Sequence, residues 1–216
     1  MQIDTVLWDW NGTLLDDVDA AVASMNDLLA RCGKPPTTRE EYREMIDIPV
    51  INYYRKLFDF QETPFEELAD GFMRGYGQYI RSCGLMRGAR ETLRRLHKSG
   101  VRQIIVSSFH EGALRGYLRH FGVEGYFEAV SGAGDYISEG KIERARALFE
   151  KRAIRPEQTL CVGDMVHDYE LARALGTQCV LIPNGQQAAE KLRGTGARLE
   201  RDLAAIPALA GGNGAF

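Results

Sequence analysis

The stretch that decides the fold is Thr5-Val6-Leu7-Trp8-Asp9-Trp10-Asn11-Gly12-Thr13-Leu14-Leu15-Asp16-Asp17. It begins with an apolar run that contains β-branched residues, a composition typical of a buried strand. Asn11-Gly12 follows, and this dipeptide is typical of a sharp turn. The pattern therefore predicts that Asp9 lies at the carboxyl end of a strand, the edge at which open parallel sheets bind ligands.

The segment after this stretch, residues 16–85, has the pattern of a helical block. Apolar residues recur at helical spacing through residues 16–31. Thr37-Thr38 begins a second helix with a capping sequence, and Thr63-Pro64 begins a later, longer one. The block contains no strand candidate. The sequence therefore predicts an all-helical cap, inserted after the first strand and lying over the carboxyl edge of the sheet.

From Gly88 onward, strands and helices alternate. The expected strands are residues 101–107, 129–131, 159–162 and 178–182, and the expected helices are residues 89–99, 112–120, 141–152 and 168–175. This alternation predicts an α/β fold, a Rossmann-like core with a parallel sheet and helices on both faces. We expect a core domain of residues 1–15 and 86–216, a cap domain of residues 16–85, and fraying of residues 211–216.

The overall composition narrows the class of protein. The 216 residues are 44% apolar and 26% charged, with a formal net charge of −3, and scattered basic residues predict no nucleic-acid partner. The sequence shows no signal-peptide pattern and no apolar run near the roughly 20 residues of a membrane span. The four cysteines form no CxxC pair, which argues against disulfides and zinc and favours a cytoplasmic location. We expect a monomer or a homodimer.

Polar side chains lie at the ends of four predicted strands. Asp9 follows the first strand, Ser107-Ser108 end the second, Lys141 begins the helix after the third, and Gly163-Asp164-Met165-Val166-His167-Asp168 follows the fourth. Each of these alone could be a turn, helix-cap or solvent-exposed residue. Because the carboxyl ends of parallel strands meet at one edge of the sheet, their coincidence predicts a single site.

The order of these motifs resembles that of the haloacid dehalogenase superfamily. The shared pattern is Asp-x-x-Gly-Thr, an apolar run ending in Ser, Gly-Lys, and Gly-Asp-x-x-x-Asp. A helical cap inserted after the first motif resembles the phosphoglycolate-phosphatase-like branch of that superfamily. The resemblance covers residues 3–209, almost the whole chain.

The resemblance implies a Mg²⁺-dependent phosphatase that acts on a small phosphorylated metabolite, in the manner of phosphoglycolate phosphatases. Asp9 would attack phosphorus and form an aspartyl-phosphate. Mg²⁺ would be held by Asp9, the backbone carbonyl of Asn11 and Asp164. Asp168 would lie next to the direct ligands of the metal and orient Lys141.

The phosphoryl oxygens need hydrogen-bond donors and positive charge as the transition state forms. By resemblance, Ser107 and the groups around Gly12, Thr13 and Ser108 would bind these oxygens. Lys141 would stabilise the charge that grows on them.

One position departs from the pattern of the family. Its phosphatases usually carry a second Asp two residues after the nucleophile, as general acid and base, and this chain has Asn11 there. An amide donates hydrogen bonds but does not exchange a proton in this way. Loss of a general acid–base typically costs about 10²–10⁴-fold in rate.

Several alternatives follow from Asn11. The enzyme could be slow or restricted to good leaving groups, it could pass the phosphoryl group to an acceptor other than water, or His110 or His167 could supply the proton. The chain could also be a non-catalytic protein that binds a phosphorylated ligand. The acidic pair Asp164 and Asp168 argues against a metal-independent dehalogenase, which has no use for it.

The sequence does not identify the substrate, because residues of the cap select it. The candidate cap contacts are Arg43, Tyr53, Tyr54, Arg55 and Arg74. Lys34 and Lys56 are the cap lysines available for Schiff-base chemistry, and neither has a sequence context that favours it.

Overall fold

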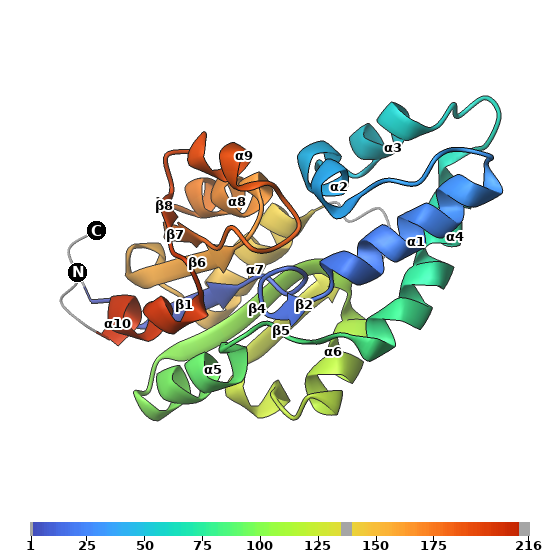
Figure 1. The fold of residues 1–216 in the computed structure, drawn as a ribbon. Coiled ribbons are helices and arrows are strands. Elements are labelled where there is room, and N and C mark those ends of the chain that lie inside the picture. The colour runs from blue at the N-terminus through green and yellow to red at the C-terminus, as the bar shows by residue number, and fades with distance from the viewer. Residues whose placement is uncertain (1, 135–139, 212–216) are drawn as a thin grey trace.

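The computed structural model describes residues 2–134 and 140–211, so residues 212–216, for which fraying was expected, lie outside the described part. The central sheet has six strands in the order β5-β4-β1-β6-β7-β8, with every neighbouring pair parallel. In Figure 1 it lies among the helices of the core. The strands are β1 (Thr5–Trp8), β4 (Arg102–His110), β5 (Ala129–Ala133), β6 (Thr159–Gly163), β7 (Gln178–Leu181) and β8 (Arg198–Leu199). The predicted α/β, Rossmann-like fold is confirmed.

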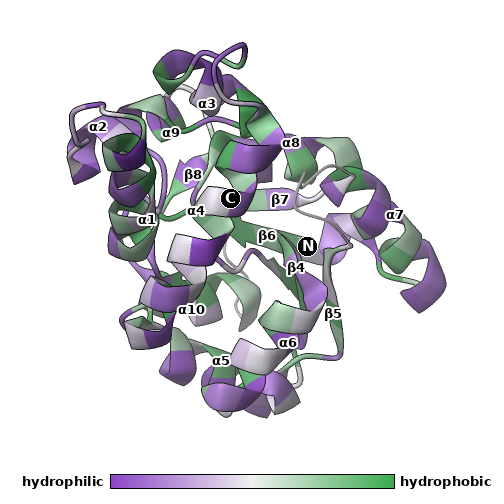
Figure 2. Cartoon of the chain, turned by 90° about the vertical axis from the view of Figure 1, so that its right-hand side faces the viewer, coloured by the Kyte–Doolittle hydropathy of each residue, from purple (hydrophilic) through white to green (hydrophobic). Residues whose placement is uncertain are grey.

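Helices cover both faces of the sheet. The core helices are α5 (Ala89–Lys98), α6 (Glu111–His120), α7 (Lys141–Arg152), α8 (Val166–Leu175), α9 (Ala189–Arg193) and α10 (Ile206–Gly211). α7 and α8 bury one face, to which Leu7 points, whereas Val6 and Trp8 belong to the core cluster on the opposite face, with α5, α6 and α10. This alternation along β1 is that of a strand buried on both faces. Figure 2 shows green at β6 in the middle of the sheet and purple on the outer parts of α2 and α7.

Four helices occupy the segment predicted as a cap. They are α1 (Val18–Arg31), α2 (Arg39–Met45), α3 (Ile51–Leu57) and α4 (Phe65–Tyr79). α1 and α4 pack along each other and extend away from the sheet (Figure 1). Short 3₁₀ turns lie at Ile80–Ser82, Glu124–Tyr126, Pro156–Gln158 and Leu203–Ala205. The exact domain boundaries at residues 15–16 and 85–86 stay a prediction.

Two short strands that the sequence pattern did not predict join the helical block to the core. β2 (Leu15–Asp16) and β3 (Gly84–Leu85) form an antiparallel pair. The Met86 backbone amide also donates to the Leu14 carbonyl, at 2.8 Å. The chain therefore leaves and re-enters the core through one paired ribbon.

Further differences from the prediction concern β4, α8 and β8. β4 continues past Ser107 to His110, with an irregular register between Val106 and His110. α8 begins at Val166 rather than Asp168, and β8 was not predicted. In the described part of the chain, no helix has the length and apolar character that crossing a membrane requires.

The only two tryptophans of the sequence lie on either side of Asp9. Trp8 and Trp10 both have 0% exposure. The Trp8 indole N–H donates to the Gln103 side-chain oxygen at 3.3 Å. Large apolar side chains thus surround the backbone from which Asp9 projects.

Candidate active site

The turn after β1 positions Asp9 at the carboxyl edge of the sheet. The Asp9 amide donates to the Val162 carbonyl at 3.0 Å, so the backbone stays tied to β6 where β1 ends. Gly12 then adopts φ 73°, and a Cβ atom there would overlap the Asp164 carboxylate. Only glycine therefore allows the turn to pack this closely against Asp164.

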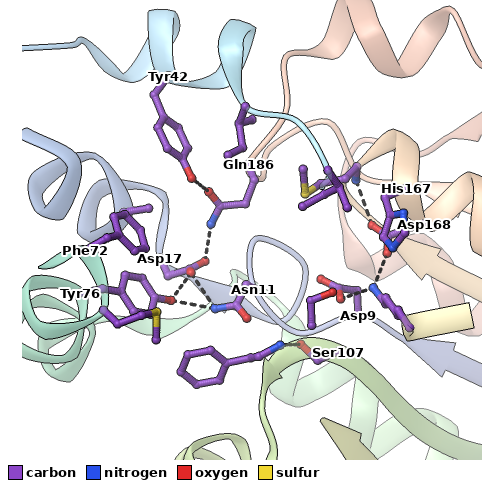
Figure 3. A pocket seen from close by; sticks show the side chains of 18 residues that line it. Asp9, Asn11, Asp17, Tyr42, Phe72, Tyr76, Ser107, His167, Asp168 and Gln186 are labelled. Carbon is purple, nitrogen blue, oxygen red and sulfur yellow. Dashed lines mark hydrogen bonds and ion pairs between the residues drawn. The ribbon is translucent and has the colours of Figure 1, made fainter. Parts of the chain in front are cut away.

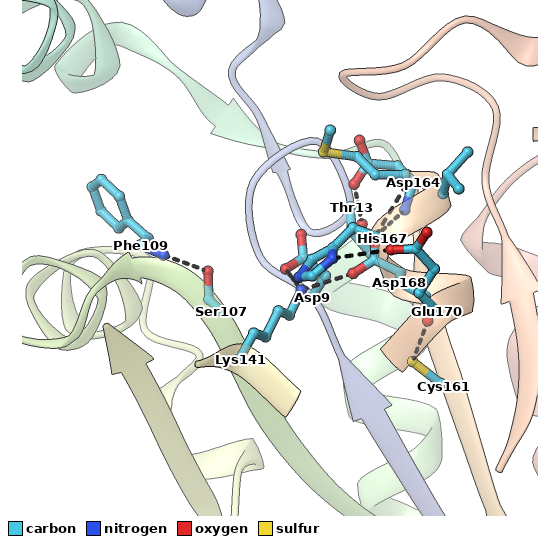
Figure 4. A network of polar contacts seen from close by, with 12 residues as sticks. Asp9, Thr13, Ser107, Phe109, Lys141, Cys161, Asp164, His167, Asp168 and Glu170 are labelled. Atoms are coloured by element: carbon cyan, nitrogen blue, oxygen red, sulfur yellow. Dashed lines mark hydrogen bonds and ion pairs between the residues drawn. The ribbon is translucent and has the colours of Figure 1, made fainter. Parts of the chain in front are cut away.

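Three carboxylates and one lysine from four elements meet at this edge (Figure 4). Ligand oxygens of Asp9, Asp164 and Asp168 all lie within 4.8 Å of one another. The Lys141 ammonium lies 2.6 Å from Asp9 Oδ1 and 2.7 Å from Asp168 Oδ1. The structure therefore brings together four of the residues singled out from the sequence.

Asp168 holds the loop between β6 and α8 as well as the lysine. Its second oxygen, Oδ2, accepts hydrogen bonds from the backbone amides of Asp164 at 3.1 Å and Met165 at 3.0 Å. Asp168 lies in the first turn of α8, where a carboxylate is also stabilised by the helix dipole. One side chain thus fixes the positions of both Lys141 and Asp164.

Burial dominates the electrostatics of the cluster. It raises the pKa of Asp9 to about 7, although Lys141 acts in the opposite direction. Burial also raises the pKa of Asp164, and the neighbouring Asp9 and Asp168 raise it further. Burial alone would lower the pKa of Lys141, but Asp168 and Asp9 outweigh it, so its pKa is raised and the ammonium stays charged.

The donor set fits a small hard cation. One lysine neutralises part of the charge of three buried carboxylates, and the remaining charge favours a divalent ion. Carboxylate oxygens are the ligands that Mg²⁺ prefers. Asp9, Asp164 and Asp168 are therefore the groups that could hold it.

Ser107 and Ser108 line the same cavity as Asp9 and Lys141. The Ser107 hydroxyl oxygen accepts a hydrogen bond from the Phe109 amide at 3.1 Å. Its carbonyl accepts one from the Arg144 guanidinium at 3.0 Å. These contacts fix the serine where an oxyanion could receive its hydroxyl.

Two residues predicted to bind phosphate make other contacts. The Thr13 hydroxyl is fully buried and donates to Asp164 Oδ1 at 2.6 Å. The Gly12 amide donates to Asp17 Oδ1 at 2.7 Å. Neither residue lines the cavity. In this structure both shape the turn around the carboxylates, because their donors are already used.

Asn11 belongs to a network that the sequence did not reveal (Figure 3). Its amide nitrogen donates to Asp17 Oδ2 at 2.8 Å and to the Tyr76 hydroxyl at 2.7 Å. Tyr76 in turn donates to Asp17 Oδ2, and Gln186 Nε2 donates to Asp17 Oδ1 at 3.0 Å. An ionised carboxylate only accepts hydrogen bonds, so the Nδ2 atom of Asn11 must face Asp17. The Oδ1 atom of Asn11 is then its remaining polar side-chain atom.

Asp17 is the centre of this network. It is 1% exposed and accepts hydrogen bonds from four neutral groups, those of Asn11, Gly12, Tyr76 and Gln186. Burial raises the pKa of Asp17, whereas these hydrogen bonds act to lower it. From the sequence it was only the second acid after an apolar run, and no local signal indicated its partners.

The cap helix α2 is fastened to the core segment 183–191. Tyr42 donates to the Gln186 side-chain oxygen at 3.0 Å. The Arg43 guanidinium donates to the carbonyls of Pro183 at 2.7 Å and Gln187 at 3.0 Å. Arg43, a candidate substrate contact, therefore holds the cap against the core.

None of the five candidate cap contacts lines the cavity at Asp9. Tyr53 and Tyr54 line a second cavity inside the cap. Arg55 and Arg74 are exposed. The periodicity of apolar residues predicts the helices but not the directions of these side chains. The structure does not support a contact of these five side chains with the substrate.

Of the two histidines considered as proton donors, His167 lines the cavity and His110 does not. His167 Nδ1 lies 3.5 Å from Glu170 Oε2. Burial lowers the pKa of His167, and Lys141 lowers it further. The neutral imidazole is therefore its prevailing form near neutral pH.

A Rossmann-like core, a helical insertion after β1, and a buried carboxylate cluster with one lysine define the class of haloacid dehalogenase-like hydrolases. The chain belongs to this family, whose sequence profile matches residues 6–182. The resemblance stated from the sequence motifs is thus confirmed.

The most informative relatives carry two different activities in their names. The chain is 28% identical over 189 residues to a phosphoglycolate phosphatase of Pseudomonas putida, covering 83% of this chain and 69% of that protein. It is 30% identical over 209 residues to the tyrosine-protein kinase PtkA of Mycobacterium tuberculosis, covering 94% and 70%. Both alignments span most of this chain.

Solved structures show the same fold. A haloacid dehalogenase-like family hydrolase from Streptococcus pneumoniae matches with a TM-score of 0.79 at 16% identity, covering 95% of this chain and 97% of that one. The structure of Mycobacterium tuberculosis PtkA matches with a TM-score of 0.73 at 27% identity, covering 87% of each chain.

Proposed function

We propose that this chain is a Mg²⁺-dependent phosphatase that acts on a small phosphorylated metabolite through an aspartyl-phosphate on Asp9. The observation that carries the proposal is the meeting of Asp9, Lys141, Asp164 and Asp168. Of these, Asp9, Lys141 and Asp168 line one end of a cavity that Ser107 also lines. The similarity to phosphoglycolate phosphatases supports it. The absence of a CxxC pair in the sequence supports the further proposal of a cytoplasmic location.

In the first step, a carboxylate oxygen of Asp9 attacks phosphorus, and the bond from phosphorus to the leaving oxygen breaks. Lys141 is held by Asp168 next to Asp9, so its charge can offset the charge that grows on the phosphoryl oxygens. The Ser107 hydroxyl donates to one of them. Mg²⁺, when bound, neutralises the phosphate dianion and so lets an anionic nucleophile approach.

In the second step, a water attacks the same phosphorus, and the bond to Asp9 breaks and releases phosphate. Asn11 can neither protonate the leaving oxygen nor take a proton from this water. Its Nδ2 is also committed to Asp17 and Tyr76. Turnover therefore depends strongly on how stable the leaving group is as an anion.

A second candidate function is transfer of the phosphoryl group to an acceptor other than water. Asn11 favours it, because the aspartyl-phosphate lasts longer when no residue activates water. The similarity to a relative named as a tyrosine-protein kinase supports it as well. Both candidates share the first step on Asp9.

Hydrolysis of p-nitrophenyl phosphate tests the proposal, because its good leaving group needs no acid. We expect turnover with Mg²⁺, loss of turnover with EDTA, and loss in Asp9→Asn. The control is Asp16→Asn, since Asp16 is an exposed acid at the end of β2. Retained turnover in Asp9→Asn would refute the assignment of the nucleophile.

The same assay separates the two candidates. With an added alcohol as acceptor, a hydrolase releases p-nitrophenol and inorganic phosphate in equal amounts. A phosphotransferase releases more p-nitrophenol than phosphate, because part of the phosphoryl group appears on the alcohol.

A further inference from the structure

The cavity next to Asp9 has an apolar side formed largely by the cap (Figure 3). It has a volume of about 180 Å³. The side chains that line its apolar side include Tyr42, Ile46, Ile48, Phe72, Met73 and Tyr76 of the cap. The catalytic candidates line the opposite end, so a bound phosphomonoester would direct its organic group toward the apolar side.

The polar atoms on the cap side are already used. The Tyr42 hydroxyl donates to Gln186, and the Tyr76 hydroxyl donates to Asp17. Tyr76 also stacks on Phe72, with ring centroids 5.7 Å apart, and meets Phe109 edge-on at 6.0 Å. The organic group of a substrate therefore meets rings and aliphatic side chains.

The charges around the cavity disfavour a second anionic group on the substrate. Among the described residues that line it, Lys141 is the one lysine or arginine, and it is paired with Asp9 and Asp168. The sequence of residues 135–139 contains neither lysine nor arginine. Asp17 adds a further buried carboxylate to the lining.

Phosphoglycolate is therefore a poor fit for this cavity. Its carboxylate would lose water on entering and find no positive partner on the cap, while Asp17 would repel it. Arg43 of the cap does not supply that positive partner, because its guanidinium donates to two carbonyls of the core.

A second cavity lies inside the cap, next to the first. It has about 170 Å³ and shares Tyr42, Ile46, Ile48, Phe72 and Met73 with the first. An apolar cavity of about 150 Å³ is enough to bind benzene. One aromatic ring, or a branched alkyl group of similar size, can thus be accommodated.

Resting on the proposed function, we propose that the substrate is a phosphomonoester whose organic group is uncharged and apolar, of about the size of one aromatic ring. The cap selects this group by burying it among Ile46, Ile48, Phe72 and Met73, and it rejects an organic group that carries a carboxylate.

The test compares benzyl phosphate with phosphoglycolate, which are both phosphates of primary alcohols, so neither has an activated leaving group. We expect kcat/KM for benzyl phosphate to exceed that for phosphoglycolate by about 10²-fold or more. Benzylphosphonate, which is not hydrolysed, should likewise bind more tightly than phosphonoacetate to the Mg²⁺-loaded protein. Equal or better use of phosphoglycolate overturns the proposal.

Acetyl phosphate serves as a probe of the chemistry alone, because it is small and has a good leaving group. Turnover of acetyl phosphate together with a preference for phosphoglycolate refutes only the substrate class. No Mg²⁺-dependent turnover of acetyl phosphate refutes the proposed function and the substrate class with it.

Met73→Arg places a cation on the apolar side and should shift the preference toward phosphoglycolate by about 10-fold or more. The matched control is Gln78→Arg, which adds the same charge at an exposed position of the same helix, α4. An equal shift in both variants would show that overall charge, and not the cavity, sets the preference. If Met73→Arg does not fold, the substrate comparison in the unmodified protein decides alone.

Discussion

Asn11→Asp restores the acid that phosphatases of the family usually carry, and in this chain we expect it to destabilise the protein. The amide nitrogen of Asn11 lies 2.8 Å from Asp17 Oδ2. A carboxylate in its place would bring two acidic groups into contact in a buried position. The hydrogen bond from Asn11 to Asp17 would be lost at the same time.

The size of the effect follows from this geometry. Two like charges about 4 Å apart repel by about 4 kcal/mol at the effective dielectric constant typical of proteins. For a chain of this length, that corresponds to a fall in Tm of about 8–16 °C. The fall in Tm should reach this size at about pH 8 and be smaller at about pH 5, because at the lower pH a proton shared by the two carboxyl groups relieves the repulsion.

The matched control exchanges the two side chains, in Asn11→Asp/Asp17→Asn. The new amide at position 17 can accept from Gly12 and Gln186 with its oxygen and donate to the new carboxylate with its nitrogen. Tyr76 can still donate to that carboxylate. We therefore expect the double substitution to recover most of the stability that the single substitution loses.

The measurement is the Tm of the unmodified chain, of Asn11→Asp and of the double variant, each without metal at both pH values. Stability of Asn11→Asp equal to that of the unmodified chain at about pH 8 would refute the reasoning. So would a double variant less stable than the single one, since the two positions would then act independently.

Three further outcomes are expected. Burial raises the pKa of Asp9 from its usual 3.8 to about 7, so the metal-free protein loses stability as the pH rises from about 4 to about 7. Mg²⁺ should therefore raise Tm more at about pH 8 than at about pH 6. An equal rise in Tm at the two pH values would contradict this. Lys141→Met leaves buried carboxylates without a counter-charge and should lower the free energy of unfolding by about 3–5 kcal/mol, measured by urea denaturation with EDTA at about pH 8. An unchanged midpoint would argue against the ion pairs of Lys141 with Asp9 and Asp168. Arg43→Ala removes two hydrogen bonds to the core and should cost about 2 kcal/mol, whereas unchanged stability with a raised KM would make Arg43 a substrate contact instead.

Local signals explain why most of the fold could be predicted from the sequence. Apolar runs and glycine or proline boundaries mark the long strands and helices, and parallel topology then brings their carboxyl ends together. Asp9, Lys141 and Asp168 meet for this reason. β2 and β3 are two residues long each, which is too short for any periodicity to show.

The network around Asp17 could not be predicted in this way. Tyr76 is 59 residues from Asp17, and Gln186 is 169 residues from it. Their meeting depends on how the cap lies on the core, which no local pattern encodes. For the same reason, the sequence alone does not show that Arg43 holds the cap in place.

Trp8 and Trp10 give this site an optical property of its own. The two indoles are the only ones in the sequence, both are fully buried, and they lie on either side of Asp9. Their emission therefore reports from the backbone of the nucleophile, with no contribution from distant tryptophans. Occupancy of the site can thus be followed by intrinsic fluorescence in the unlabelled protein, including variants that no longer turn over substrate.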